Sequence, residues 1–132
     1  MRPCAAQVSG VLRLLESLGA RTIVLGRSRD DAAGATCEAV ARAWVARGGE
    51  VLDVVDWPET AASWLRQARR FTAHQPDAWV VAARPSGWKG MCRRLIGSAQ
   101  WAPRRTIVAA SLTPGDQIAD GVRGVTAEGR AW

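Results

Sequence analysis

The chain has 132 residues, with 48% hydrophobic and 23% charged positions and a formal net charge of +6. This length suits one domain with a single buried core, and the balance of apolar and charged residues argues against a disordered chain. The positive charge would suit nucleic acid, but the arginines are scattered and neither a base-reading motif nor aromatic–basic interleaving occurs, so nucleic-acid binding is not expected.

The first predicted element is a helix, because the leucines and valines of 8–18 form one apolar face and Gly19 follows as a stop. A short β-branched strand over 22–25 comes next and gives way to a polar turn. Asp30 or Asp31 can cap the helix that follows this turn, and both charges favour the positive end of that helix.

The middle of the chain continues the alternation of strands and helices. A second strand is predicted over 51–55, and an apolar stripe over 61–71 predicts the third helix. The apolar run 78–83 predicts the third strand. Ser86 is the expected cap of a fourth helix over 86–96.

The last part of the chain supplies a fourth strand over 106–110, a short helix opened by 113–116, and a fifth strand over 122–126. Buried strands that alternate with helices of ~15 residues indicate a parallel sheet with helices on both faces, since right-handed crossovers place them there. The sequence therefore predicts a single α/β domain over 1–132. Its expected form is a three-layer α/β/α sandwich with a mainly parallel five-stranded sheet of flavodoxin-like type.

The predicted sheet points to one of its edges as the place for a ligand. In open α/β sheets, ligands bind beyond the carboxyl ends of the strands, where the strand order switches. The turns after the first four strands are therefore expected to form the site, with Arg27 or Arg84 binding a carboxylate through two hydrogen bonds. The residues predicted to line it are Arg27, Ser28, Trp57, Arg84, Ser86, Trp88, Ser111 and Thr113.

Trp57 and Trp88 differ from the other tryptophans because both are predicted to lie in turns at this edge. An aromatic ring there could close over an amino acid or an aromatic ligand. It could equally form the hot spot of a protein interface. The sequence leaves both interpretations open.

The sequence carries no recognisable catalytic or cofactor motif. The turn after the first strand reads GRSRDD where a dinucleotide fold needs GxGxxG, and neither GxxxxGK[ST] nor GxSxG occurs. The only histidine, His74, is predicted in a polar loop at the opposite end of the sheet. Cys4, Cys37 and Cys92 form no CxxC pair, which predicts neither disulfides nor a zinc site, and Cys92 is interpreted as a core residue. We therefore expect a non-catalytic protein without metal or cofactor.

The N-terminal segment bears on where the protein resides. Polar residues such as Gln7 and Arg13 interrupt its apolar positions, so it is typical of an amphipathic helix and not of a secretory signal. No run of the sequence approaches the ~18 apolar residues of a membrane span. As written, the sequence predicts a soluble, cytoplasmic protein.

Several phrases of the sequence, taken in order, resemble one family. They are RPCAAQ before the first helix, GARTIVLG, DDAAG, GGEVLDVVDWP, QPDAWVVAA and PRRTIVAASL, and GGEVLDVVDWP and QPDAWVVAA carry most of the likeness. The chain resembles the type 1 periplasmic binding proteins, in particular receptors for branched-chain amino acids. That family has two α/β lobes that close on a ligand across a hinge. This chain resembles the continuous central portion of the second lobe.

The resemblance implies a periplasmic-binding-lobe topology and a ligand site at the carboxyl edge of the sheet. In the family, the turn after the first strand of this lobe carries an acidic residue and a Tyr-Gly pair, whose tyrosine faces the ligand. Asp30 or Asp31 matches the acidic residue, but Ala33 precedes Gly34 in place of the tyrosine, so that aromatic contact is missing. The turn 84–88 corresponds to another turn that contributes to ligand binding in the family.

Three functions are considered on this basis. The first is a non-catalytic lobe that binds or senses a small molecule, an amino acid or a carboxylate, and that a partner protein, a second copy or a missing lobe completes. The alternative is a protein-interaction module that keeps the lobe fold without binding a ligand. A small flavodoxin-like enzyme is the third, and the sequence offers no nucleophile–base pair for it. A homodimer would suit the first two, because a lone lobe leaves its hinge-facing surface uncovered.

Overall fold

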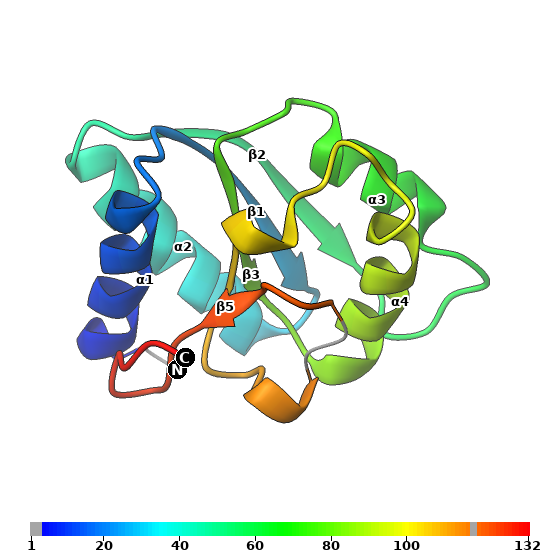
Figure 1. Ribbon diagram of the computed structural model, residues 1–132. Helices are drawn as coiled ribbons and strands as arrows, with labels where there is room; N and C mark the ends of the chain where they lie inside the picture. The colour runs from blue at the N-terminus through cyan, green and yellow to red at the C-terminus, as the bar shows by residue number, and fades with distance from the viewer. Residues whose placement is uncertain (1–3, 117–118) are drawn as a thin grey trace.

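The computed structural model of the protein describes residues 4–116 and 119–132, and it shows strands and helices that alternate along the chain (Figure 1). Among the residues described, none of the helices is both long and apolar enough to cross a bilayer. In chain order the elements are α1 (Ala5–Ser17), β1 (Thr22–Ser28), α2 (Asp31–Ala46), β2 (Glu50–Trp57), α3 (Leu65–Thr72), β3 (Ala78–Ala82), α4 (Pro85–Leu95), the 3₁₀ turn η1 (Pro103–Arg105), β4 (Thr106–Val108), the 3₁₀ turn η2 (Pro114–Asp116) and β5 (Arg123–Gly124).

The five strands form one parallel sheet in the order β2-β1-β3-β4-β5. The chain starts in the interior of the sheet at β1, moves outward to β2, and then returns to place β3 on the other side of β1. The order therefore switches between β1 and β3, which is the switch point of a flavodoxin-like sheet. The predicted parallel five-stranded sheet is confirmed.

Two helical layers cover the sheet (Figure 1). Helices α1 and α2 pack on one face, and α3 and α4 pack on the other. Alternate side chains of β1 serve the two cores, since Ile23 and Leu25 join the core beneath α1 and α2 whereas Val24 joins the core beneath α3 and α4. The predicted three-layer sandwich is therefore confirmed.

Aromatic rings fill the core beneath α3 and α4. The ring of Trp57 meets Phe71 edge-on at 6.0 Å and stacks with Trp88 at 6.1 Å between ring centroids. Trp88 in turn meets Trp101 edge-on at 6.3 Å. Gly26 of β1 leaves room for these rings, because a Cβ atom there would lie 2.6 Å from Trp57 and 2.7 Å from Phe71.

The ends of the first two helices follow the sequence signals. A side-chain oxygen of Asp30 accepts a hydrogen bond from the backbone N–H of Ala33 at 3.0 Å, so Asp30 caps α2. Gly19 and Gly48 follow α1 and α2 with φ angles of 67° and 88°, a left-handed conformation that glycine adopts without strain. The cap predicted at Asp30 or Asp31 is confirmed at Asp30, and the stop predicted at Gly19 is confirmed.

The helices beyond β2 start differently from the prediction. Helix α3 starts at Leu65, because the Trp64 indole N–H donates to the carbonyl of Pro58 at 2.9 Å and so ties the preceding residues to the loop after β2. The N-cap of α4 is Arg84 and not Ser86. In place of a serine cap, the carboxylate of Glu59 accepts from the backbone N–H of Gly87 at 3.2 Å.

The last strands are shorter than predicted. Strand β4 ends at Val108, and β5 contains only Arg123 and Gly124. The backbone of Gly124 exchanges two hydrogen bonds with Trp132, so the C-terminal segment folds back along β5. The predicted helix opened by 113–116 is a 3₁₀ turn over Pro114–Asp116, and its expected continuation into 117–118 lies outside the described residues.

Candidate functional site

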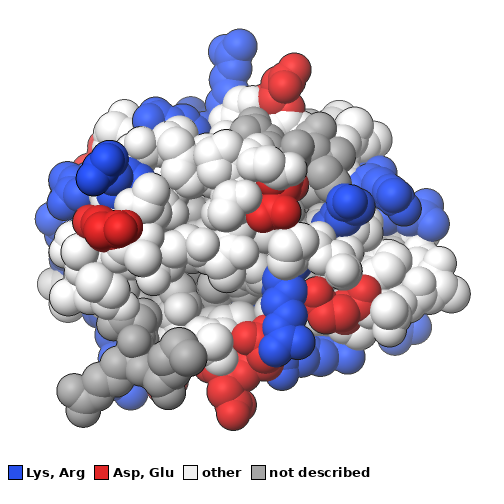
Figure 2. Space-filling view, turned by 90° about the horizontal axis from the view of Figure 1, so that it is seen from below, with Lys and Arg blue, Asp and Glu red and all other residues white. Residues whose placement is uncertain are grey.

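A pocket of about 290 Å³ lies at the switch point of the sheet, where the ends of β1, β3 and β4 meet the first turns of α1 and α2. Figure 2 looks onto this end of the molecule, where the surface is hollowed and charged side chains lie mostly around the hollow. The pocket is lined by Cys4, Gln7, Ser28, Asp30, Ala32, Ala33, Thr36, Ala83, Arg84, Ala110, Ser111 and Ala127.

Asp30 is the centre of the polar network in this pocket. The hydroxyl of Ser28, at the end of β1, donates to one carboxylate oxygen, and the Ala33 N–H donates to the other. The Nε atom of Arg84 lies 3.7 Å from the first oxygen. Burial acts to raise the pKa of Asp30, but the hydrogen bonds and the charge of Arg84 together lower that pKa below its ordinary value of 3.8. Asp30 is thus a carboxylate at neutral pH and attracts Arg84 to the rim.

Gln7 is a buried lining residue that the list of predicted site residues omits. Its side-chain oxygen accepts a hydrogen bond from the backbone N–H of Ala110 at 2.9 Å, which ties the first turn of α1 to the segment after β4. The Nε2 group of Gln7 makes no hydrogen bond within the described residues. A signal for this burial exists, because Gln7 lies four residues before Val11 and therefore on the apolar face of the helix.

The structure brings three of the predicted residues together in this pocket, Ser28, Arg84 and Ser111. Trp57 and Trp88 lie elsewhere, because their rings are 0% and 2% exposed in the core beneath α3 and α4. Trp57 is the last residue of β2 and Trp88 lies within α4, so neither occupies a turn. The expectation that these rings face a ligand or a partner is therefore corrected.

Arg27 does not line the switch-point pocket. Its Nε donates to the carbonyl of Ser28 at 3.1 Å, and its guanidinium covers Gly34, where a Cβ atom would lie 3.0 Å from Nη2. It lines a separate pocket of about 580 Å³ beside α2 and β2. Of the two arginines predicted to bind a carboxylate, Arg84 alone reaches the switch-point pocket.

The other candidate side chains lie away from the pocket. Ser86 is exposed in the first turn of α4, and the Thr113 hydroxyl donates to the carboxylate of Asp116 at 3.0 Å. His74 is half exposed in the loop after α3, at the opposite end of the sheet. Cys92 is buried, and burial raises the pKa of its thiol to about 12, which disfavours the reactive thiolate. Within 4–116 and 119–132, no cluster of three or more His, Cys, Asp or Glu side chains could hold a metal ion.

Comparison with known proteins identifies structural neighbours. The sequence matches no protein-family model and no curated protein. A periplasmic ligand-binding protein of a branched-chain amino acid ABC transporter from Burkholderia xenovorans has a TM-score of 0.67 at 14% identity, over 81% of this chain and 29% of that one. A Rhodospirillum rubrum protein assigned to branched-chain amino acid ABC transport has a TM-score of 0.71 at 18% identity, over 92% and 37%. An ABC transporter substrate-binding protein from Sphaerobacter thermophilus has a TM-score of 0.56 at 22% identity, over 64% and 23%.

These neighbours are much longer than the region that they share with this chain. The chain covers 29%, 23% and 37% of their lengths, in each case with a single α/β unit. The likeness extends over 81%, 64% and 92% of the present chain. The resemblance to one lobe of the periplasmic binding proteins is therefore confirmed at the level of the fold. The protein has the fold of a single lobe of an ABC-transporter solute-binding protein.

Proposed function

We propose that the protein is a non-catalytic lobe that binds a small carboxylate-bearing molecule, such as an amino acid, in the switch-point pocket. The observation that carries this proposal is the position of Arg84. Its Nε faces Asp30 at the rim, while its two terminal nitrogens form no hydrogen bond within the described part of the chain. Those nitrogens present the planar fork that binds a carboxylate through two parallel hydrogen bonds.

Other donors in the pocket support a carboxylate ligand. Helix α2 starts at the pocket, and the first N–H groups of a helix have no partner within that helix and favour negative charge. The carboxylate of Asp30 occupies part of this helix end and would repel a ligand that approached it directly. A ligand carboxylate on the Arg84 side, with the Ser111 hydroxyl and the Gln7 amide as further donors, avoids that repulsion.

The pocket is one wall of the proposed site. Its volume of about 290 Å³ is just below the range of roughly 300–1,000 Å³ for small-molecule pockets, which bury most of the surface of their ligand. This chain covers only 23% to 37% of the length of the solved neighbours. We therefore propose that a second surface completes the site. A partner protein, a second copy or another part of a longer chain would supply it.

A thermal-shift panel with L-leucine, glutarate, phosphate and adenosine monophosphate tests the proposal. A ligand at ~100 times its dissociation constant adds about 2.7 kcal/mol of stability, which raises the melting temperature by several degrees for a domain of this size. We expect the shift only with a carboxylate ligand, and we expect Arg84→Ala to abolish it. Arg29→Ala is the matched control, because Arg29 is similarly exposed but pairs with Asp56 at 2.7 Å and does not line the pocket.

Two results would contradict the proposal. A response that Arg84→Ala leaves unchanged would remove Arg84 from the site. If no ligand raised the melting temperature, the result would favour the alternative, a protein-interaction module that keeps the lobe fold. That alternative gains no support from Trp57 and Trp88, since both rings are buried and neither can serve as an exposed hot spot.

A further inference from the structure

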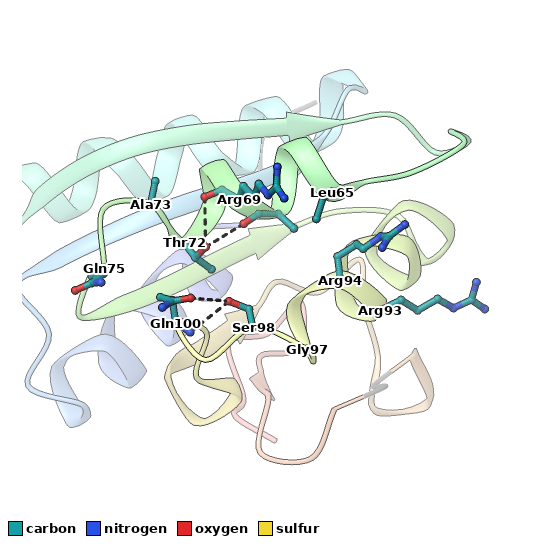
Figure 3. A pocket seen from close by; sticks show the side chains of 11 residues that line it. Leu65, Arg69, Thr72, Ala73, Gln75, Arg93, Arg94, Gly97, Ser98 and Gln100 are labelled. Carbon is teal, nitrogen blue, oxygen red and sulfur yellow. Dashed lines mark hydrogen bonds between the residues drawn. The ribbon is translucent and has the colours of Figure 1, made fainter.

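The groove between α3 and α4 is the second feature of the surface that suggests binding (Figure 3). It has a volume of about 590 Å³ and lies where both helices end, next to the loops that lead into β3 and β4. It is therefore at the opposite end of the sheet from the switch-point pocket. Small side chains such as Ala68 and Thr72 form its floor, and Leu65, 39% exposed, adds apolar surface at one end.

The groove carries uncompensated positive charge. Arg69 of α3 and Arg93 and Arg94 of α4 line it, and no acidic residue does. None of the three guanidinium groups forms an ion pair or a hydrogen bond with any residue that the structure describes. Arg70, the neighbour of Arg69, differs because it is paired with Asp53 at 2.8 Å. The arginines of the groove are thus available to an external partner.

The helix ends beside the groove do not neutralise this charge. Arg69, Arg93 and Arg94 lie in or next to the last turns of α3 and α4, where the carbonyl end of each helix has a partial charge equivalent to roughly −0.5. Two helix ends therefore offset about one of the three positive charges. The remaining excess favours an anion with more than one negative group.

We propose that this groove binds an acidic segment of a partner protein, whose carboxylates pair with Arg69 on one wall and with Arg93 and Arg94 on the other. Arginines on both walls of the groove suit a peptide that carries several carboxylates. Figure 3 shows Gln75 and Gln100 at the end of the groove away from Leu65, where their amides can bind a peptide backbone. The apolar surface of Leu65 fits a peptide better than a bare ion.

Two other occupants fit the observations less well. Nucleic acid is bound without sequence preference by basic grooves that also provide aromatic rings for base stacking, and no aromatic residue lines this groove. A second copy placed groove to groove is disfavoured because Arg69, Arg93 and Arg94 of the two copies would face one another, and no acidic residue lines the groove.

Fluorescence anisotropy with a labelled hexaglutamate peptide tests the proposal, with hexaglutamine as the uncharged control. We expect hexaglutamate to bind the full chain and to be released by added salt. The double variant Arg69→Glu/Arg94→Glu should weaken binding by about tenfold or more, because like charges then face each other. The matched control Arg123→Glu/Arg130→Glu has the same net charge and changes exposed arginines outside the groove, so we expect it to stay within about twofold of the parent.

Three outcomes would overturn the proposal. Equal weakening by both double variants would show that the peptide responds to net charge alone. Binding of hexaglutamine with the same affinity would remove the role of the carboxylates. The groove would be assigned to nucleic acid if an oligothymidylate of equal charge bound more tightly than hexaglutamate and if Arg69→Glu/Arg94→Glu weakened that binding. All four substituted arginines are exposed, and far-UV circular dichroism of both variants verifies that the fold is retained.

Discussion

Asp30 links the stability of α2 to the geometry of the candidate site. One carboxylate oxygen caps the helix through the Ala33 N–H, and the other accepts from Ser28 and faces Arg84. The neighbouring Asp31 is exposed in the first helical turn and makes no side-chain hydrogen bond with the described residues. Two adjacent aspartates that look equivalent in the sequence therefore have different roles, and the difference can be measured.

Asp30→Ala should lower the free energy of unfolding by about 1 kcal/mol near neutral pH, the usual loss for a helix N-cap. Asp31→Ala removes only a favourable charge at the helix start and should cost a few tenths of a kcal/mol. Urea denaturation monitored by circular dichroism compares the two variants with the parent. Equal destabilisation by the two substitutions would contradict the separate roles.

The pH dependence of this contribution has a definite sign. The folded state lowers the pKa of Asp30, so the ionised carboxylate stabilises the fold above the ordinary value of 3.8, and this contribution is lost as the pH falls through the folded-state value. The stability gap between the parent and Asp30→Ala should therefore narrow on acidification below 3.8. Asp77, whose pKa is also lowered, is present in both proteins and cancels from the comparison. A gap that stays constant under acid would show that ionised Asp30 contributes nothing.

At the scale of the element, β2 is an edge strand of the sheet, and side chains hydrogen-bond to part of its free backbone. The Asp53 side chain accepts from the N–H of Val54 at 2.8 Å, while Arg70 donates both to Asp53 and, at 3.3 Å, to the carbonyl of Val54. A register shift of the β1–β2 pair lies just before this position. Occupied backbone groups and an irregular register are two means by which edge strands avoid pairing with another chain.

Asp53→Ala should expose this edge to self-association. The substitution frees the N–H of Val54 and releases Arg70, and Val54 is already 41% exposed. We expect size-exclusion chromatography with light scattering to show a higher mass for Asp53→Ala than for the parent as concentration increases. Arg66→Ala, on the neighbouring helix, is the control, because Arg66 is exposed and forms no ion pair among the described residues. An unchanged mass for Asp53→Ala would mean that other features protect the edge.

At the scale of the whole molecule, the layers and the place of the pocket are predictable because they depend on local patterns and on one topological rule. Alternating apolar segments predict the sandwich, and the switch point brings Ser28, Arg84 and Ser111 together. The prediction for Arg27 is wrong because its guanidinium covers Gly34 and lines the pocket beside α2 and β2, and no local pattern of the sequence specifies that direction. The hydrogen bond between Gln7 and Ala110 spans 103 positions of sequence, and such long-range pairs leave no local pattern.

The two helical layers share one sheet, and we therefore expect the chain to unfold as a single unit. Trp44 is the tryptophan of the core beneath α1 and α2, whereas Trp57, Trp79, Trp88 and Trp101 lie in the core on the other face. Tryptophan fluorescence thus reports mainly on the layer of α3 and α4. Far-UV circular dichroism also includes the longer helices α1 and α2.

Urea denaturation monitored by both signals distinguishes one folding unit from two. Every strand of the sheet except the short β5 contributes buried residues to at least one of the two cores, and β1, β3 and β4 contribute to both. Loss of either helical layer would therefore expose apolar side chains of the sheet to water. The fluorescence and circular dichroism transitions should then coincide, as they do for two-state domains of this size. Circular dichroism that persisted after the fluorescence change was complete would show that the α1–α2 layer folds independently, and the assignment of the chain to one domain would be wrong.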